Sequence, residues 1–149
     1  MILMKNAVCS ITLVFALGMS FITFACAHCQ IPCGIYGDEE RFKAMLEDVT
    51  TLRKSVKLIE ELSVVEDASA ADFNQLVRWI QNKEVHADKI SDVVLKYFLQ
   101  QRIKADADHY EEKLVALHQI VLLSMKVKQA VDQSQVDKLE NAGPEFQEL

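Results

Sequence analysis

Glycine and proline are scarce in this chain of 149 residues, which has four glycines and two prolines. Neither residue occurs between Gly37 and Gly143. Sheets need turns that usually contain these residues, whereas a long stretch rich in Leu, Val, Ala, Glu and Lys favours helices. The absence argues against a β-rich fold and predicts an all-α protein.

Basic residues are also few relative to acidic ones. The chain has 16 Lys and Arg against 22 Asp and Glu, which gives a net charge of −6. Lys5 is the only charged side chain before residue 28, so the rest of the chain is slightly more negative still. An acidic surface repels polyanions, which disfavours nucleic acid and anionic membranes as partners.

Residues 1–27 have the composition of a cleaved secretory signal peptide. Lys5 gives a positive start, an apolar run covers residues 11–24, and the sequence ACA at 25–27 matches a small-x-small cleavage site. Small residues rather than a basic stop-transfer run end the apolar stretch, which disfavours an uncleaved anchor. We therefore expect an exported chain that starts at His28, no membrane attachment after cleavage, and a periplasmic or extracellular location. A cytoplasmic chain with a cleaved propeptide is the less favoured alternative.

Cysteine is rare once this signal is removed, because only Cys29 and Cys33 remain. The default for two cysteines in an exported protein is a disulfide. A bridge across so short a loop would constrain the unfolded chain little, so it is a poor structural staple and metal chemistry explains the pair better. A lipoprotein acylated on Cys26 is another alternative, but Thr23 stands where such proteins need an aliphatic residue.

Four helices are predicted from the apolar periodicity beyond Gly37. The first is expected over about 38–62. The second should begin at Ser69, with a capping box between Ser69 and Asp72, and should bend near Asn82. The third should begin at about 106–108, and the fourth should cover 134–141 and be ended by Gly143-Pro144. Helices with one apolar face and short connections pack most simply as an antiparallel four-helix bundle. The predicted organisation is a signal at 1–27, a short amino-terminal hook at 28–37 and a bundle at 38–149.

The apolar stripes of the predicted helices indicate which side chains should form the core. On the second and third helices these stripes include Phe73, Val77, Ile80, Val85, His118 and Met125. We expect His118 to be a hydrogen-bonded core histidine, because buried histidines are ordinarily satisfied by local partners.

Cleavage after Ala27 gives His28 a free α-amine beside its imidazole. The amine of His28 and the amide and thiolate of Cys29 are spaced so that one metal ion can bind all three in fused five-membered rings. Cys33 can supply a second thiolate after the turn through residues 30–32, and the imidazole of His28 is free to act as an axial ligand. A planar set of nitrogens and thiolates favours Ni(II) or Cu(II) over zinc, which prefers tetrahedral sites. The segment therefore predicts a redox-active metal site.

The sequence HCQIPCGIY at residues 28–36 resembles the amino-terminal nickel hook of the nickel-containing superoxide dismutases, whose pattern is H-C-x-x-P-C-G-x-Y. The resemblance implies one nickel ion per chain, bound by the amine and imidazole of His28, the amide and thiolate of Cys29, and the thiolate of Cys33. It also implies that Pro32 and Gly34 shape the hook. Tyr36 is then expected to stand over the open axial face and to position superoxide.

The same resemblance implies the reaction and the partners. Superoxide is the expected substrate, converted to dioxygen and hydrogen peroxide as nickel alternates between Ni(II) and Ni(III). A homohexamer of four-helix bundles, a maturation protease and a nickel supplier are also implied. The alternative from a different class is an exported helical binding module with a Cys29–Cys33 disulfide and no metal.

The imidazole of His28 should be oriented by a hydrogen bond to its other ring nitrogen. Members of this family use a Glu and an Arg for this purpose, but an ungapped count from His28 places Ala44 at the Glu position. We expect Glu47, on the same predicted helix, and His86, near the Arg position, to take these roles.

Overall fold

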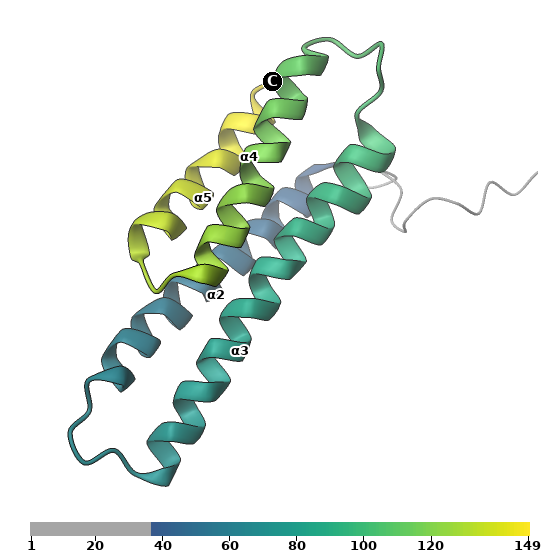
Figure 1. Cartoon of the computed structure of the whole chain (residues 1–149). Helices are drawn as coiled ribbons and strands as arrows, with labels where there is room; N and C mark the ends of the chain where they lie inside the picture. Colours follow the sequence, from purple (N-terminus) through teal and green to yellow (C-terminus); the bar gives the residue numbers. More distant parts are fainter. Residues whose placement is uncertain (1–36) are drawn as a thin grey trace, which may run out of the picture.

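The computed structural model describes residues 37–149, so the predicted signal peptide and hook lie outside the described residues. All regular secondary structure in the described chain is helical, in the order α2 (Glu39–Ser63), α3 (Ala70–Asp92), the π-helix η1 (Val93–Arg102), α4 (Tyr110–Gln129) and α5 (Gln133–Gln147) (Figure 1). The predicted all-α fold is confirmed. None of the helices in this range combines the length and apolarity that a membrane span needs.

The helices pack as two antiparallel hairpins. α2 packs against α3 and α4 against α5, while α3 also contacts α4 and α2 also contacts α5. Each helix thus has two neighbours, as in the predicted four-helix bundle. Figure 1 shows that the longer α2–α3 hairpin extends past the turn between α4 and α5 at one end of the molecule.

The first helix follows its sequence pattern closely. α2 has an apolar stripe whose buried members are Met45, Val49, Leu52, Val56 and Ile59. Leu46, which the sequence pattern also places on this stripe, is 51% exposed. Two acidic residues in the first turn favour this start, because the amino end of a helix carries partial positive charge. The predicted span of 38–62 is therefore confirmed to within a residue at each end.

The capping box at the start of α3 is also confirmed. The Ser69 hydroxyl accepts a hydrogen bond from the amide of Asp72, and the Asp72 carboxylate accepts one from the amide of Ser69. α-Helical hydrogen bonding then continues through Asn82, where a bend was predicted, and changes only at Val93, where η1 begins. The wider π turn brings the adjacent residues Tyr97 and Phe98 into the core together.

An aromatic cluster fills the end of the bundle where the described chain begins. Phe98 contacts Phe42 and Phe146, with ring centroids 5.2 and 5.0 Å away, and Tyr97 packs edge-on against Phe98 at 5.1 Å. The four rings come from α2, η1 and α5. Edge-to-face contacts of this kind add to the free energy gained by burying the rings.

The predicted end of the last helix is wrong. α5 does not stop before Gly143 but continues to Gln147 with Pro144 inside it. Proline normally excludes the α conformation at the preceding residue, partly through a clash with that residue's Cβ. Gly143 has no Cβ, so this clash is absent and the backbone can stay helical, although Pro144 cannot donate the hydrogen bond that an amide at this position would make.

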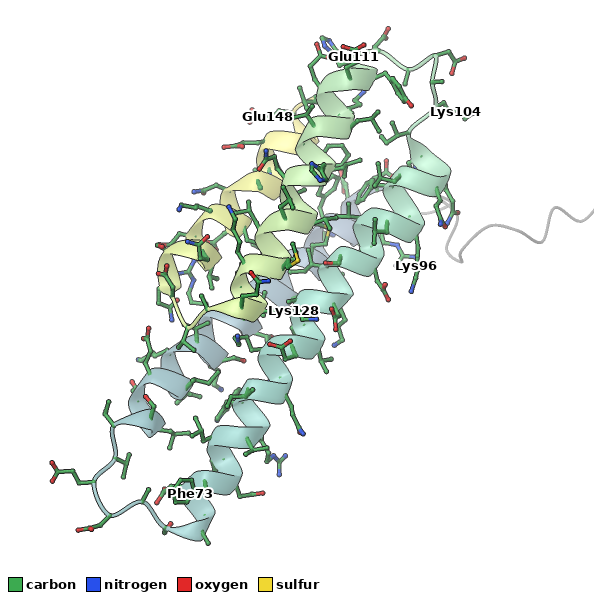
Figure 2. The ribbon with its side chains drawn as sticks, viewed as in Figure 1. Phe73, Lys96, Lys104, Glu111, Lys128 and Glu148 are labelled. Atoms are coloured by element: carbon green, nitrogen blue, oxygen red, sulfur yellow. The ribbon has the colours of Figure 1, made fainter. Side chains whose placement is uncertain are left out.

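Several predicted core residues are exposed instead. Phe73, Val77, Ile80 and Val85 lie on the surface of α3, whose buried positions are Lys83, Ala87 and Ile90. Phe73 lies near the end of the hairpin that extends past α4 and α5 (Figure 2). The sequence shows that this part of α3 has an apolar stripe but not that the shorter α4–α5 pair leaves it uncovered.

On α4 the predicted stripe is only partly correct, because Leu117 is buried but two other members are exposed. His118 is exposed and is not the core histidine that the sequence predicted, and Met125 is 47% exposed. The buried positions are Leu117, Ile120, Ser124 and Val127. Apolar residues surround much of this helix, so periodicity alone allows more than one buried face.

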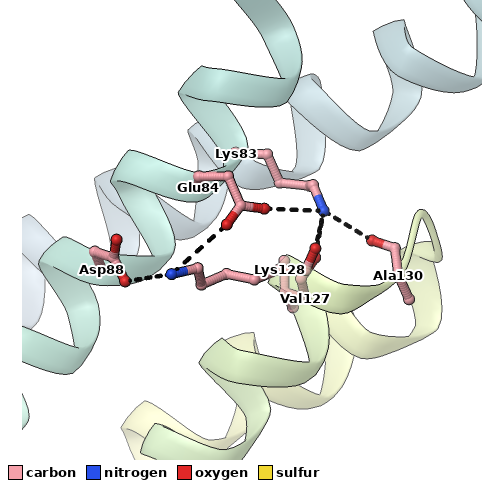
Figure 3. A network of polar contacts seen from close by, with 6 residues as sticks. All are labelled: Lys83, Glu84, Asp88, Val127, Lys128 and Ala130. Atoms are coloured by element: carbon pink, nitrogen blue, oxygen red, sulfur yellow. Dashed lines mark hydrogen bonds and ion pairs between the residues drawn. The ribbon is translucent and has the colours of Figure 1, made fainter.

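Lys83 lies in the core although it carries a charge. Its Nζ donates hydrogen bonds to the carbonyl oxygens of Val127 (2.9 Å), Ala130 (3.2 Å) and Lys128, and the Glu84 carboxylate lies 3.5 Å away (Figure 3). These carbonyls belong to the carboxyl end of α4, where a helix has no backbone donors for its last C=O groups. Lys83 therefore caps α4 from the neighbouring helix α3.

Candidate metal centre

The predicted metal ligands lie outside the described residues. This applies to His28, Cys29 and Cys33, and equally to the three residues expected to shape or cover the site, which are Pro32, Gly34 and Tyr36. Their arrangement stays a prediction. The structure does describe the start of the bundle, to which this segment is joined, because the first described residue, Gly37, directly follows Tyr36.

Gly37 leaves the bundle in a left-handed conformation, with φ of +77°. Residues with a Cβ rarely adopt this region, whereas glycine does so without steric cost. Asp38 follows in a helical conformation and starts α2. Glycine at this position therefore sets the direction in which the preceding segment leaves the helix.

Asp38 connects this exit point to the far end of η1. Its carboxylate accepts a hydrogen bond of 2.6 Å from the Tyr97 hydroxyl and bonds of 2.8 and 3.2 Å from Nε and Nη2 of Arg102. The side chain makes no capping bond to α2, so all of its described hydrogen bonds go to η1. The start of the bundle is thus fixed by three hydrogen bonds to a single carboxylate.

The electrostatics of this cluster keep Tyr97 protonated. Burial raises the pKa of the Tyr97 hydroxyl, and the hydrogen bond to the Asp38 carboxylate raises it further. The same carboxylate raises the pKa of the Arg102 guanidinium through their hydrogen bond. At neutral pH both side chains are therefore hydrogen-bond donors to Asp38, which remains the acceptor.

Sequence reasoning missed this cluster. Nothing in the sequence pattern assigned Asp38, Tyr97 or Arg102 a place near the predicted site. Asp38 and Tyr97 lie 59 positions apart, and they meet because the α2–α3 hairpin returns the chain and η1 turns the tyrosine inward. No local sequence signal reports such a contact.

His86 and Glu47, the residues predicted to orient His28, lie in different environments. Glu47 is exposed on α2. His86 is partly buried, and its Nδ1 lies 2.6 Å from a carboxylate oxygen of Asp48. Asp48 fixes the imidazole of His86 and leaves Nε2 as the ring nitrogen that it does not bind. His28 lies outside the described residues, so both contacts stay predictions.

A second metal site is not found in the described part of the chain. Between residues 37 and 149, no three His, Cys, Asp or Glu side chains are grouped closely enough to hold an ion. An apolar groove of about 250 Å³ lies between α2 and α5, and its lining includes Phe42, Met45 and Pro144 but neither His nor Cys.

Comparison with known proteins gives one match. A family model described as nickel-containing superoxide dismutase matches residues 23–149, a range that includes the HCQIPCGIY segment as well as the whole bundle. No curated protein and no solved structure matches the chain.

Proposed function

The chain belongs to the nickel-containing superoxide dismutase family, and we propose that residues 28–36 form its nickel site, with one ion per chain. Family membership makes the protein a superoxide dismutase: it converts two superoxide anions and two protons into dioxygen and hydrogen peroxide. The observation that carries the proposal is the extent of the match, which spans the predicted hook and the bundle together.

The donor set of this segment fits nickel. His28 offers an amine and an imidazole, and Cys29 and Cys33 offer thiolates. When bound, nickel supplies one-electron chemistry by alternating between Ni(II) and Ni(III). These thiolate and nitrogen donors would suit nickel better than magnesium or calcium, which prefer oxygen ligands. The segment has no carboxylate, so the harder oxygen-binding metals have no anionic side-chain ligand there.

The remaining residues of the segment have positioning roles in this proposal. Pro32 and Gly34 set the turn that brings Cys33 back toward Cys29. Tyr36 would lie beside the bound ion, where its hydroxyl would order superoxide or water. Glu47 or His86 orients the imidazole of His28, and the proposal for His86 is supported by the Asp48 contact, which fixes one ring nitrogen and leaves Nε2 for a further partner.

The proposed assembly is a homohexamer. It is supported by the exposed apolar face of α3, where Phe73, Val77 and Ile80 are 59%, 52% and 40% exposed. These residues recur at helical spacing, so they form one continuous face. A contiguous apolar surface of this kind is typical of a subunit contact.

Maturation is part of the proposal, because the α-amine of His28 becomes a ligand only after cleavage behind Ala27. This requires a maturation protease and a source of nickel. The apolar run and the ACA sequence support cleavage as a signal peptide and hence an exported, periplasmic or extracellular enzyme.

The first test is intact mass together with metal analysis of the protein purified from its own host. We expect a mass that starts at His28, about one nickel per chain, as the donor set favours, and superoxide dismutase activity. Cys29→Ser and Cys33→Ser should each abolish nickel retention and activity while helicity by circular dichroism stays nearly unchanged. An active variant would contradict the ligand assignment. A metal-free protein with a Cys29–Cys33 disulfide would favour the alternative, a helical binding module.

A further inference from the structure

The α2–α3 hairpin continues beyond the side chains that join it to α4 and α5. Arg53 on α2 binds Asp137 and Glu140 of α5. Lys83 on α3 caps the end of α4. Residues 54–82 lie between these two anchors, and Figure 1 shows this end of the hairpin extending past the turn between α4 and α5. We call residues 54–82 the hairpin extension.

The exposed apolar side chains of the extension lie on the side of α3 that faces α4 further along the helix. Glu84 contacts Lys128 of α4, and Ile80 lies four residues before Glu84. Val77 and Phe73 precede Ile80 by three and seven residues, so all three share this side. Ile80, Val77 and Phe73 are 40%, 52% and 59% exposed. The stripe therefore continues a helix-contacting surface beyond the point where α4 ends.

α2 presents a matching surface. Lys57, Glu60 and Val64 follow Arg53 by four, seven and eleven residues, which places them on the side of α2 that contacts α5 at Arg53. Val64 is 76% exposed. Both helices of the extension thus expose the sides that α4 and α5 cover elsewhere. Because an antiparallel helix pair covers these sides in the rest of the bundle, an antiparallel pair is also what fits the extension.

The charges of the extension are separated along its length. The end of the hairpin, residues 60–72, has five acidic residues and no Lys or Arg: Glu60, Glu61, Glu66, Asp67 and Asp72. The adjacent parts of the two helices, residues 53–59 and 73–83, have five basic residues and no Asp or Glu: Arg53, Lys54, Lys57, Arg78 and Lys83. We call these parts the acidic tip and the basic flanks. A partner that fits this surface carries the opposite charges in the same places.

A second copy of the chain meets these requirements in one orientation. It supplies two antiparallel helices of the same length with exposed apolar side chains. When the two extensions run in opposite directions, each acidic tip lies against the basic flanks of the other chain, and two-fold symmetry makes the two contacts identical. In the other orientation tip would face tip, and the like charges would repel each other.

We propose that the hairpin extensions of two chains pack against each other in opposite directions about a two-fold axis, with the acidic tip of each chain on the basic flanks of the other. This inference rests on the homohexamer of the proposed function, for which it names one contact and its orientation. The apolar stripe of α3 supplies the buried centre of the contact, and the separated charges select the orientation.

The test reverses one charge at each end of the contact, with Glu66→Lys in the tip and Lys57→Glu in a flank. Both positions are exposed. Each variant alone places like charges at two symmetry-related positions, so we expect the dissociation constant of the contact to rise about tenfold, as measured by sedimentation velocity over a range of protein concentrations. Glu111→Lys and Lys104→Glu make the same charge changes at the opposite end of the molecule and should assemble like the wild type (Figure 2).

An equal mixture of Glu66→Lys and Lys57→Glu tests the orientation. In a mixed pair the new lysine of one chain meets the new glutamate of the other, while the remaining Glu66 and Lys57 pair as in the wild type. We expect the mixture to assemble as tightly as the wild type, which would also show that both variants are folded. Single variants that assemble like the wild type, or a mixture that assembles no better than either variant, would overturn the proposal.

The same measurements separate this proposal from the proposed function. A monomeric wild type would contradict the homohexamer and this contact together, whereas a hexameric wild type whose two variants also stay hexameric at every concentration would overturn the contact alone. Nickel content is measured on the same samples. A hexamer without nickel would contradict the proposed metal site, and the mixing experiment would still decide the contact.

Discussion

Lys83 shows how a single buried charge can hold two helices together. A charged side chain that is 4% exposed is costly unless its donors are satisfied. Here the ammonium group has carbonyl partners at the end of α4 and a carboxylate beside it. It also lies at the negative end of the α4 dipole, which favours a cation.

Replacing this lysine tests the contribution of the cap. We expect Lys83→Met to lower the free energy of unfolding by about 2–4 kcal/mol, because the α4 carbonyls lose a charged donor in a buried site. Lys128→Met is the matched control in the same network: its pairs with Asp88 and Glu84 are near the surface, so its loss should cost no more than about 1 kcal/mol. Urea unfolding measures both. Equal effects would show that burial of the Lys83 contacts is unimportant.

Tyr97 makes stability depend on pH at the alkaline end. The folded protein raises the pKa of its hydroxyl, so the unfolded chain loses the proton at lower pH than the folded chain does. The stabilisation is present in full below the ordinary pKa of tyrosine, about 10, and is lost as pH rises through the raised value. Urea midpoints should therefore fall above about pH 10.

The variant Tyr97→Phe should flatten this fall and cost about 1–2 kcal/mol at neutral pH through the lost hydrogen bond to Asp38. Tyr110→Phe, at the start of α4, controls for the loss of a tyrosine in general. A Tyr97→Phe variant with the same alkaline slope as wild type would show that Tyr97 is not responsible for it.

Among the elements, predictability from sequence depended on how many faces of a helix are apolar. α2 has one apolar stripe, and its span was predicted to within a residue at each end. α4 has apolar residues on several faces, so Met125 and His118 were placed in the core although they are exposed. η1 was not predicted, because π-helices are rare and the apolar residues of this segment fit the pattern of a continuing α-helix.

The proline inside α5 gives a prediction at the scale of the helix. Pro144→Ala restores a helical amide, and we expect it to raise the free energy of unfolding by about 1–2 kcal/mol, less than the full interior penalty because proline also restricts the unfolded chain. Gly143→Ala meets no atom within 4 Å. Alone it should gain little, since a Cβ before proline disfavours the helix.

Combined with Pro144→Ala, the Gly143→Ala change should add up to about 1 kcal/mol, the usual difference between alanine and glycine in a helix. Urea unfolding of the two single variants and the double variant measures this coupling. Additive effects would contradict our explanation of why α5 continues through Pro144.

For the whole molecule, sequence and structure describe complementary parts. The candidate ligands His28, Cys29 and Cys33 were identified from spacing and resemblance, and they lie outside the described residues. The structure instead reveals Asp38, Tyr97 and Arg102 at the base of the segment, which no local pattern could connect. The candidate ligands are close together in the sequence, so a local pattern identifies them. The side chains that fix the start of the bundle are far apart in the sequence and meet only because the helices pack.

The exposed face of α3 gives a prediction about assembly. If Phe73, Val77 and Ile80 form a subunit contact, Phe73→Glu should dissociate the hexamer, because a carboxylate buried in an apolar interface costs several kcal/mol. Gln75→Glu, at an exposed polar position of the same helix, is the control for added charge. Sedimentation velocity measures both. A hexameric Phe73→Glu variant would place the contact elsewhere.

Because the backbone at Gly37 is left-handed, an amino acid of either handedness can be placed at this position before α2 and the two can be compared. L-Alanine there would meet no atom within 4 Å, so its cost would come from the backbone angle alone. D-Alanine prefers the mirror-image region and adopts a φ of +77° as easily as L-alanine adopts the opposite sign. In a chemically synthesised chain, exchanging one enantiomer for the other at residue 37 would change only the direction in which the segment leaves α2. The difference in nickel retention between the two would then measure how much the metal site depends on the handedness of a single α-carbon.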